Sequence, residues 1–486
     1  MAGSHGELRR DREAAARADL IELRLDGLEE PDPGAALAGR RRPAVVTCRP
    51  RWDGGRFEGG EDERRRILEA ALEAGAEYVD VEWGAPFRDD LLTRCPDRIV
   101  LSWHESGGVP SDLTERVRAM LATGAARAKM AVLVGRLADL PILAACGRQH
   151  GASGRLVLVG MGEAGVATRV LPSRFGSVWT YAGDVAAGQL SLERLLDEFR
   201  IRSVGPGTRV YGVVGRSVRR SVSPAMHNAA FAVTKVDAVY LPLETEAFED
   251  VDASRTVLGL EGCSVTAPHK LAAARASVSR DSVVLRLDAA NTLRWSQSLA
   301  GWESTNTDLE GFLAPLADLE LGGLRATVVG AGGAARAVVA GLTDREARVT
   351  VRARDATRAR LVAEPFGAGW GPLPVPPGTW DLLVNAIPAE SGPDGVSSPV
   401  EGTALDGRLV YDLAYHPAET PLLAEARRRG CTTIGGLDML VAQGARQFEW
   451  WTGQQAPTEV MREAAARRLA AMHGERNGRP EERYAP

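Results

Sequence analysis

The first 200 residues alternate short apolar runs with charged segments of helical spacing, and this alternation constrains the fold more than any other feature of the sequence. Seven apolar runs indicate strands, at 20–25, 44–48, 78–83, 99–103, 129–134, 155–160 and 177–181. Strands that alternate with helices form parallel sheets with right-handed crossovers. Seven such units in this length favour a (β/α) barrel of the TIM type over an open sheet.

A turn of glycine, proline and glycine at 205–207 divides the chain, because it directly follows a predicted helix that ends near residue 201. A second α/β pattern begins at 210–215, and a further strand–loop–helix at 324–342 indicates two subdomains there. We therefore expect an α/β barrel and a two-part α/β region with a Rossmann-type nucleotide domain. The expected limits are 1–203, 208–320 completed by 437–472, 321–436, and a disordered tail at 473–486.

The charge and cysteine content narrow the class of protein. The net charge is -5 and the arginines are scattered among acids, so we expect no nucleic-acid partner. The five cysteines are dispersed without a CxxC pair, which indicates reduced thiols and no metal site. No apolar run of about 18 residues occurs, so we expect a cytoplasmic protein without a membrane segment. The sequence does not predict the oligomeric state.

The stretch "VVGAGGAARA" places glycines and an alanine in a G-x-G-x-x-A frame between an apolar strand and an alanine-rich helix. Such a loop lets backbone amides approach a pyrophosphate at the start of the helix. A chance glycine turn is the alternative, but the placement favours a dinucleotide. The expected contacts are Gly330, Ala331, Gly332, Gly333 and Ala334.

The end of the next strand bears on the choice of nucleotide. Arg354 and Arg358 suit the 2′-phosphate of NADP(H), whereas an acid would suit the ribose hydroxyl of NAD. Asp355 lies between them and would weaken the preference. NADP is favoured, and NAD stays open.

In the first half, polar residues stand where each apolar run ends, and parallel strands in a barrel bring these ends to one mouth. Lys129 lies within an apolar run, which is unusual for an ammonium group. Either its tip reaches solvent at the start of the strand, or it is a desolvated amine with a lowered pKa that forms a Schiff base with a ketone. His104 could then move the proton, and arginines could hold a carboxylate.

The second half, over about 210–470, resembles shikimate dehydrogenase. The resemblance is carried by "SVSPAMHN", "GCSVTAPHK", "DAANTL", "STNTDLEGF", "LLVNAIP" and "GGLDMLVAQGARQFEWW". It implies a catalytic pair, Lys270 and Asp308. It also implies substrate contacts at Ser221, Ser223, Thr266, Asn291, Tyr415 and Gln443, and cofactor contacts at Asn385, Gly436 and Met439. An N-cap role would explain Ser223 but not Ser221. Ser264 stands where this family usually has asparagine.

The first half, over about 15–200, resembles type I 3-dehydroquinate dehydratase. The resemblance implies that Lys129 forms the Schiff base and that His104 shuttles the proton with Glu58 as its neighbour. Substrate contacts are implied at Glu22, Arg24, Arg49, Arg169 and Gln189. Two features depart from the family. Val185 replaces a serine, and the first barrel strand is missing, so we expect a helix before residue 18, seven strands, and a dehydratase weaker than the reductase.

Together the resemblances predict a bifunctional enzyme of aromatic amino-acid (chorismate) biosynthesis. It would convert 3-dehydroquinate to 3-dehydroshikimate, and then reduce that product to shikimate with NADPH. Two alternatives stay open. The barrel could be a degraded, non-catalytic module for binding or folding, or the second half could oxidise quinate.

Overall fold

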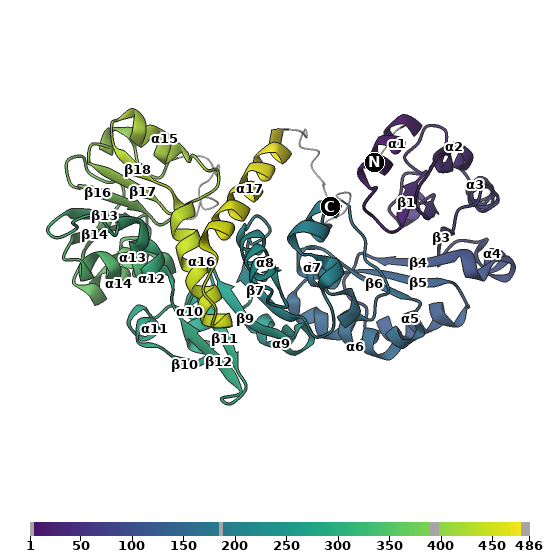
Figure 1. Ribbon diagram of the computed structural model, residues 1–486, viewed down its shortest axis with the longest axis horizontal. Coiled ribbons are helices and arrows are strands. Elements are labelled where there is room, and N and C mark those ends of the chain that lie inside the picture. The colour runs from purple at the N-terminus through teal and green to yellow at the C-terminus, as the bar shows by residue number, and fades with distance from the viewer. Residues whose placement is uncertain (1–3, 184–187, 388–397, 478–486) are drawn as a thin grey trace. The chain divides into compact units, whose positions relative to one another are not determined.

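The computed structural model describes residues 4–183, 188–387 and 398–477. The chain forms two compact units (Figure 1). The first comprises residues 1–208, 243–245 and 249–259, and the second comprises 209–242, 246–248 and 260–486. The boundary between the units therefore falls next to the predicted turn at 205–207.

A six-stranded parallel sheet forms the centre of the first unit, with its strands in chain order. The strands are β1 (Ile21–Arg24), β2 (Ala44–Thr47), β3 (Tyr78–Glu82), β4 (Ile99–Glu105), β5 (Arg127–Leu133) and β6 (Leu156–Met161). The helices are α1 (His5–Ala14), α2 (Pro33–Leu37), α3 (Glu61–Glu73), α4 (Arg88–Arg94), α5 (Leu113–Ala122), α6 (Leu140–His150), α7 (Val166–Val170) and α9 (Glu249–Leu258). The helix predicted before residue 18 is confirmed as α1.

One of the seven predicted strands is absent, and the sheet has β1 and β6 at its edges. Residues 177–181 run beside β6, where the Val178 amide donates to the Leu156 carbonyl (2.9 Å). The next pairing is made by a side chain, because the Ser177 hydroxyl accepts from the Leu158 amide (2.7 Å) and donates to the Leu158 carbonyl (2.9 Å). A hydroxyl replaces the backbone ladder here, so 177–181 do not form a strand. The described part of the sheet is thus half a barrel rather than seven strands.

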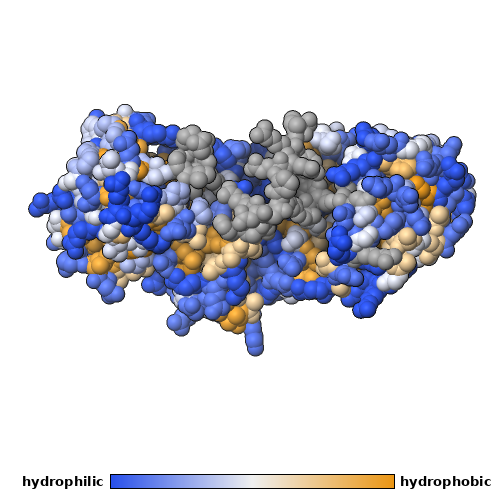
Figure 2. Space-filling view, turned by 90° about the horizontal axis from the view of Figure 1, so that it is seen from above, coloured by the Kyte–Doolittle hydropathy of each residue, from blue (hydrophilic) through white to orange (hydrophobic). Residues whose placement is uncertain are grey.

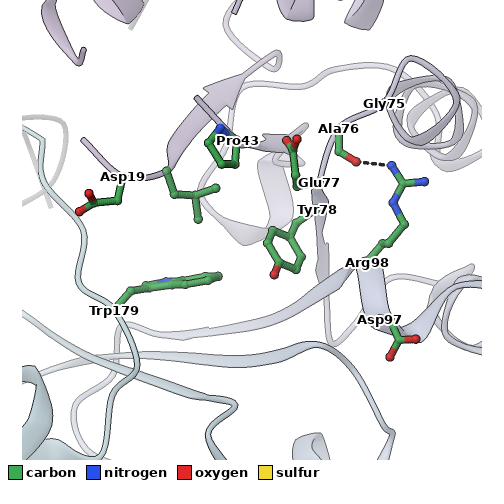
Figure 3. A pocket seen from close by; sticks show the side chains of 10 residues that line it. Asp19, Pro43, Gly75, Ala76, Glu77, Tyr78, Asp97, Arg98 and Trp179 are labelled. Atoms are coloured by element: carbon green, nitrogen blue, oxygen red, sulfur yellow. Dashed lines mark hydrogen bonds between the residues drawn. The ribbon is translucent and has the colours of Figure 1, made fainter. Parts of the chain in front are cut away.

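A cavity of about 650 Å³ opens at the amino-terminal ends of these strands (Figure 3). Tyr78 and Trp179 form its aromatic wall, with ring centroids 6.0 Å apart. Arg98 lies at the rim and donates to the Ala76 carbonyl. The carboxyl-terminal ends, where parallel sheets carry their chemistry, lie at the opposite end of the strands.

The second unit contains two six-stranded sheets. In the first the strand order is β10-β12-β11-β9-β7-β8, where β11 runs antiparallel to both neighbours. Its strands are β7 (Arg209–Gly215), β8 (Ala238–Glu244), β9 (Leu260–Val265), β10 (Ser277–Arg280), β11 (Thr292–Ser296) and β12 (Gly301–Thr305). Its helices are α8 (Ser223–Thr234), α10 (Lys270–Ala276), α11 (Ser282–Leu287) and α12 (Asp308–Leu313).

The other sheet of this unit is parallel throughout, with the order β15-β14-β13-β16-β17-β18. This is the doubly wound Rossmann arrangement, in which the order of the strands reverses between β13 and β16. The strands are β13 (Arg325–Val329), β14 (Arg348–Ala353), β15 (Gly369–Pro372), β16 (Leu382–Asn385), β17 (Leu409–Asp412) and β18 (Thr432–Ile434). Its helices are α13 (Gly333–Asp344), α14 (Ala356–Ala363) and α15 (Pro421–Arg428), while α16 (Gly436–Thr452) and α17 (Thr458–Asn477) follow in the chain and pack with α8.

The last helix corrects one prediction, since α17 reaches Asn477 and so enters the tail expected to be disordered from 473. Residues 478–486 lie outside the described part. The surface in Figure 2 is mostly hydrophilic, with apolar residues in separate patches. Among the described helices, none is both long and apolar enough to cross a membrane.

Candidate active sites

Lys129 lies on the polar inner face of the first sheet. In the register of β4 and β5 it stands opposite Ser102, and His104 follows two residues later on the same face. The Lys129 ammonium is 3.0 Å from an oxygen of Asp80 and 3.8 Å from one of Glu22. The ring of Tyr181 lies 4.6 Å away. The lysine side chain is 8% exposed, which excludes the interpretation of a tip in solvent.

Asp80 connects this lysine to a buried arginine. Arg49 donates to Asp80 (3.0 Å), Glu82 (2.9 Å) and Asp53 (2.9 Å), and Ser102 donates to Asp80 (2.6 Å). Arg49 was predicted to bind substrate. In the structure its guanidinium is already held by three carboxylates, so its first role is to fix the acids around Lys129.

The predicted lowering of the Lys129 pKa is wrong. Burial acts to lower it, but the negative charges around the amine, above all Asp80, outweigh burial and raise the pKa of Lys129 above its ordinary value. In the same way, burial acts to raise the pKa of Asp80, but Arg49 and Lys129 hold it below its usual range. The resting site therefore contains an ion pair rather than a neutral amine.

His104 contacts an acid, although not the predicted one. Its Nδ1 lies 2.8 Å from an oxygen of Asp53. Burial, with the charge of Arg49, lowers the pKa of His104, so the ring is neutral and able to accept a proton at neutral pH. Glu58 instead pairs with Arg51, and both side chains are 70% exposed. The acid beside His104 is therefore Asp53, four residues after Arg49, and not Glu58.

The other residues predicted for this site differ in how free they are to bind. Arg24 forms a two-pronged pair with Asp26 (2.7 and 2.8 Å). Arg169, on α7, is 2% exposed, and its Nε has no hydrogen-bond partner among the described residues. Burial lowers its pKa to about 10. Val185 belongs to the segment 184–187, which lies outside the described residues. Gln189 comes just after this segment, and its role stays a prediction.

The second unit holds the other predicted pair. Lys270 is the first residue of α10 and forms an ion pair with Asp308, the first residue of α12. The other oxygen of Asp308 accepts a hydrogen bond from the Asn291 amide (2.7 Å). The same amide nitrogen lies 3.3 Å from the Gln443 side-chain oxygen. The structure thus brings together the predicted pair of Lys270 and Asp308 with two of the predicted substrate contacts, Asn291 and Gln443.

Both serines of "SVSPAMHN" were expected to bind substrate, with an N-cap role as the alternative for Ser223, but Val222 is the N-cap of α8. The Ser221 hydroxyl accepts from the Ser223 amide (3.2 Å), so it is Ser221 that serves the start of α8. Ser223 begins the helix and is 6% exposed. Thr266 directly follows β9, and Tyr415 packs against the apolar cluster of α8 and α16. Their contacts with substrate stay predictions.

The glycine loop lies between β13 and α13 at the reversal of the Rossmann sheet. Gly330 has φ of 115°, a conformation that favours glycine, and Gly332 is the N-cap of α13. A Cβ atom on Gly333 would lie 3.0 Å from Cδ of Lys270. Ala331 and Ala334 are half-buried beside these glycines. The loop therefore offers amides for a pyrophosphate directly beside Lys270.

The surroundings of this loop fit NADP. Arg354 and Arg358 are exposed after β14. Asp355 is the N-cap of α14 and accepts from the Thr357 amide (2.9 Å), so its charge is engaged by the helix. Asn385 holds Asp412 (2.8 Å) across two strand ends.

Two predicted cofactor contacts lie on the first turn of α16. Gly436 begins this helix, where a Cβ would lie 2.2 Å from the Leu413 carbonyl oxygen. Met439 is buried in the core of the Rossmann sheet.

Sequence reasoning missed Asp53, Asp80, Glu82 and Tyr181. A signal for two of them was present, because Asp80 and Glu82 alternate in "YVDVEW" and so share one face of an otherwise apolar strand. No group of three or more His, Cys, Asp or Glu residues able to hold a metal occurs in the described part of the chain.

Comparisons with known proteins agree with this arrangement of two sites. Residues 2–206 match the family Type I 3-dehydroquinase. Residues 213–293 match the shikimate dehydrogenase substrate binding domain, and 436–466 match the shikimate 5′-dehydrogenase C-terminal domain.

Relatives cover either the second half or nearly the whole chain. A shikimate dehydrogenase (NADP(+)) from Methanocella arvoryzae is 39% identical over 53% of this chain and 97% of its own length. A crystal structure of shikimate dehydrogenase in complex with NADP+ has a TM-score of 0.50 at 31% identity, covering 55% of this chain and 97% of that one. The chloroplastic bifunctional 3-dehydroquinate dehydratase/shikimate dehydrogenase of Arabidopsis thaliana is 32% identical, and the match covers 91% of this chain and 79% of the relative. With both halves matched in one relative, the chain belongs to the family of bifunctional 3-dehydroquinate dehydratases/shikimate dehydrogenases.

Proposed function

We propose that the two reactions of this family are carried by Lys129 in the first unit and by Lys270 in the second. The enzyme dehydrates 3-dehydroquinate to 3-dehydroshikimate, and then reduces that ketone to shikimate with NADP(H). The observation that carries the dehydratase assignment is the lysine buried on the inner face of the sheet, 3.0 Å from Asp80. Its partner on β4 is Ser102, and the neutral His104 follows Ser102 by two residues on the same face.

The geometry supports dehydration through an imine. Lys129 must first lose a proton, and the neutral ring of His104 can accept it, whereas Asp80 at 3.0 Å keeps the resting ammonium charged. The free amine then adds to the ketone, and loss of water gives a Schiff base, which acidifies the neighbouring carbon. His104, oriented by Asp53, removes the proton from that carbon and returns it to the departing hydroxyl group. Hydrolysis of the imine releases the product and restores the lysine.

Arg169 supports a carboxylate substrate for this site. The Nε of this buried guanidinium has no hydrogen-bond partner among the described residues, which is costly, and a bound carboxylate would satisfy it with a charge-assisted hydrogen bond. Arg24 and Arg49 are less available, because carboxylates of the protein already hold them. We therefore propose Arg169 as the anchor of the substrate carboxylate.

The imine can be tested by chemical trapping. Borohydride is added to the full-length protein with 3-dehydroquinate, and the adduct is located by peptide mass spectrometry. We expect one stable adduct, on Lys129. Absence of an adduct in a protein that still reduces 3-dehydroshikimate would favour the non-catalytic barrel.

The second site supports ketone reduction. NADPH, when bound, supplies the hydride, and residues 330–334 with Arg354 and Arg358 would hold it. Lys270 is placed to donate a proton to the oxygen of the reduced carbonyl, and Asp308 holds that ammonium in position. Asn291, Gln443, Ser221, Ser223, Thr266 and Tyr415 are proposed to bind substrate. A coupled assay from 3-dehydroquinate with NADPH tests both sites together, and rates on quinate and shikimate separate the quinate-oxidising alternative.

We also propose the domain limits 1–203, 208–320 with 437–472, and 321–436. Six-stranded sheets within each of these ranges support the division. All five cysteines are free thiols, which supports a reducing compartment such as the cytoplasm. The proposed partners are the small-molecule substrates.

A further inference from the structure

A continuous chain of hydrogen bonds reaches Asp308 from the far side of the substrate sheet. Tyr240 on β8 donates to the Ser264 hydroxyl (2.6 Å), and Ser264 on β9 donates to the side-chain oxygen of Gln447 (2.6 Å). The Gln447 amide donates to the Thr292 hydroxyl (3.0 Å), which donates to the Asn291 side-chain oxygen (2.7 Å). The Asn291 amide then donates to Asp308.

Every hydrogen bond in this chain points the same way, from Tyr240 towards Asp308. Direction matters at Asn291, because its side chain presents an oxygen on one side and an amide on the other. The Thr292 hydroxyl and the Thr307 amide (2.9 Å) both donate to that oxygen. The NH₂ group is thereby turned towards the carboxylate that holds Lys270. A reversed Asn291 would set its oxygen against a carboxylate oxygen.

The far end of the chain is held by the two residues that close the "SPAMHN" motif. Asn228 forms two hydrogen bonds with the backbone of Tyr240 (2.8 and 3.0 Å), and the His227 ring stacks on the Tyr240 ring with centroids 4.4 Å apart. Burial lowers the pKa of His227 to about 3 and raises the pKa of Tyr240 above its ordinary value. Both groups are therefore uncharged at neutral pH, so this end supplies orientation rather than charge.

We propose that Gln447 is a positioning residue of the reductase, which acts through Thr292 to fix the Asn291 amide against Asp308. It is 1% exposed on α16, one turn beyond Gln443. Ser264, the link between Tyr240 and Gln447, stands where shikimate dehydrogenases usually have asparagine. A serine hydroxyl can accept from Tyr240 and donate to Gln447 at once, as observed. The proposal rests on the proposed reductase function of Lys270 and Asp308.

The test uses full-length enzyme and NADP+-dependent oxidation of shikimate. Gln447→Met keeps the length of the side chain and removes its hydrogen bonds to Ser264, to Thr292 and to the Asn291 carbonyl (3.3 Å). Thr292→Val keeps the shape and removes the hydroxyl, whereas Thr292→Ser restores the hydroxyl. We expect kcat to fall about tenfold in Gln447→Met and Thr292→Val, because Asn291 loses its orientation. We expect Thr292→Ser to stay within about twofold of the unaltered enzyme, and KM for NADP+ to be unchanged in all three.

A matched control separates positioning from stability. Trp451 lies one turn further along α16 and donates a buried hydrogen bond to the Leu293 carbonyl (3.0 Å). Trp451→Phe removes a buried hydrogen bond between the same helix and the same strand, so it should lower the melting temperature and keep kcat.

Three outcomes overturn the proposal: wild-type kcat in both Gln447→Met and Thr292→Val, an equal loss in Thr292→Ser, or an equal loss in Trp451→Phe. If Gln447→Met does not fold, the two Thr292 variants decide. An unaltered enzyme that fails to oxidise shikimate would instead contradict the proposed function itself.

Discussion

Each half of the molecule contains a lysine paired with an aspartate, but the two pairs have different surroundings. Lys129 and Asp80 lie within strands, among Arg49, Glu22 and Glu82. Lys270 and Asp308 begin two helices, and the hydrogen bonds around them come from the uncharged side chains of Asn291 and Gln443. The first pair belongs to a network of charges, and the second to a network of amides and hydroxyls.

This difference teaches how one residue type serves opposite tasks. A nucleophilic lysine must lose its proton during the reaction, so it needs a neutral base nearby, and here that base is His104, which Asp53 orients. A proton-donating lysine must be charged and must point at the substrate oxygen, so it needs directional hydrogen bonds that fix its position. The charged network around Lys129 and the aligned network around Asp308 match these two needs.

The largest effects should come from exchanging the two lysines for alanine. Lys129→Ala should abolish dehydration and leave NADPH-dependent reduction of 3-dehydroshikimate intact. Lys270→Ala should lower reductase kcat by about three orders of magnitude with little change in NADPH affinity, because its contact with substrate is made mainly in the transition state. Separate steady-state assays measure both. Loss of both activities in either variant would show that the halves do not act independently.

A smaller effect is expected where His104 is held. Asp53→Asn removes the charge that orients the imidazole, so dehydratase kcat should fall about a hundredfold. Glu58→Gln is the matched control, because Glu58 is exposed and paired only with Arg51. Equal losses in the two variants would restore Glu58 to the site.

The charged network predicts a shift in pH dependence. Asp80 is the strongest influence that raises the Lys129 pKa, and burial acts in the opposite direction. Asp80→Asn should therefore lower the Lys129 pKa, and the rise of dehydratase kcat/KM with pH should move to lower pH. The reductase profile should not move. A shift to higher pH would show that Asp80 does not set the charge of the amine.

The smallest effect concerns cofactor choice. Arg354→Ala should weaken the preference for NADPH over NADH about tenfold, since a charge-assisted hydrogen bond to a phosphate contributes about 1.5–3 kcal/mol. The ratio of kcat/KM values for the two cofactors measures this. An unchanged ratio would leave Arg358 as the residue that selects the phosphate.

The parts of the fold and site that follow local patterns could be predicted from the sequence. Six strands, helix α1 and the pair of Lys270 with Asp308 appear where alternation and motifs placed them. Three features depend on contacts between distant segments, which no local pattern encodes. These are the use of the Ser177 side chain in place of a ladder, the choice of Asp53 over Glu58, and the raised pKa of Lys129.

The close approach of Gly333 to Lys270 has a consequence for how this enzyme can change over time. A Cβ on Gly333 would lie 3.0 Å from Cδ of Lys270, which is tighter than an ordinary contact, so the lysine stem would have to shift by a few tenths of an ångström. A side chain introduced at Gly333 in the nucleotide loop would therefore also displace Lys270. A change at this one position would thus be felt both in the nucleotide loop and at the proposed proton donor.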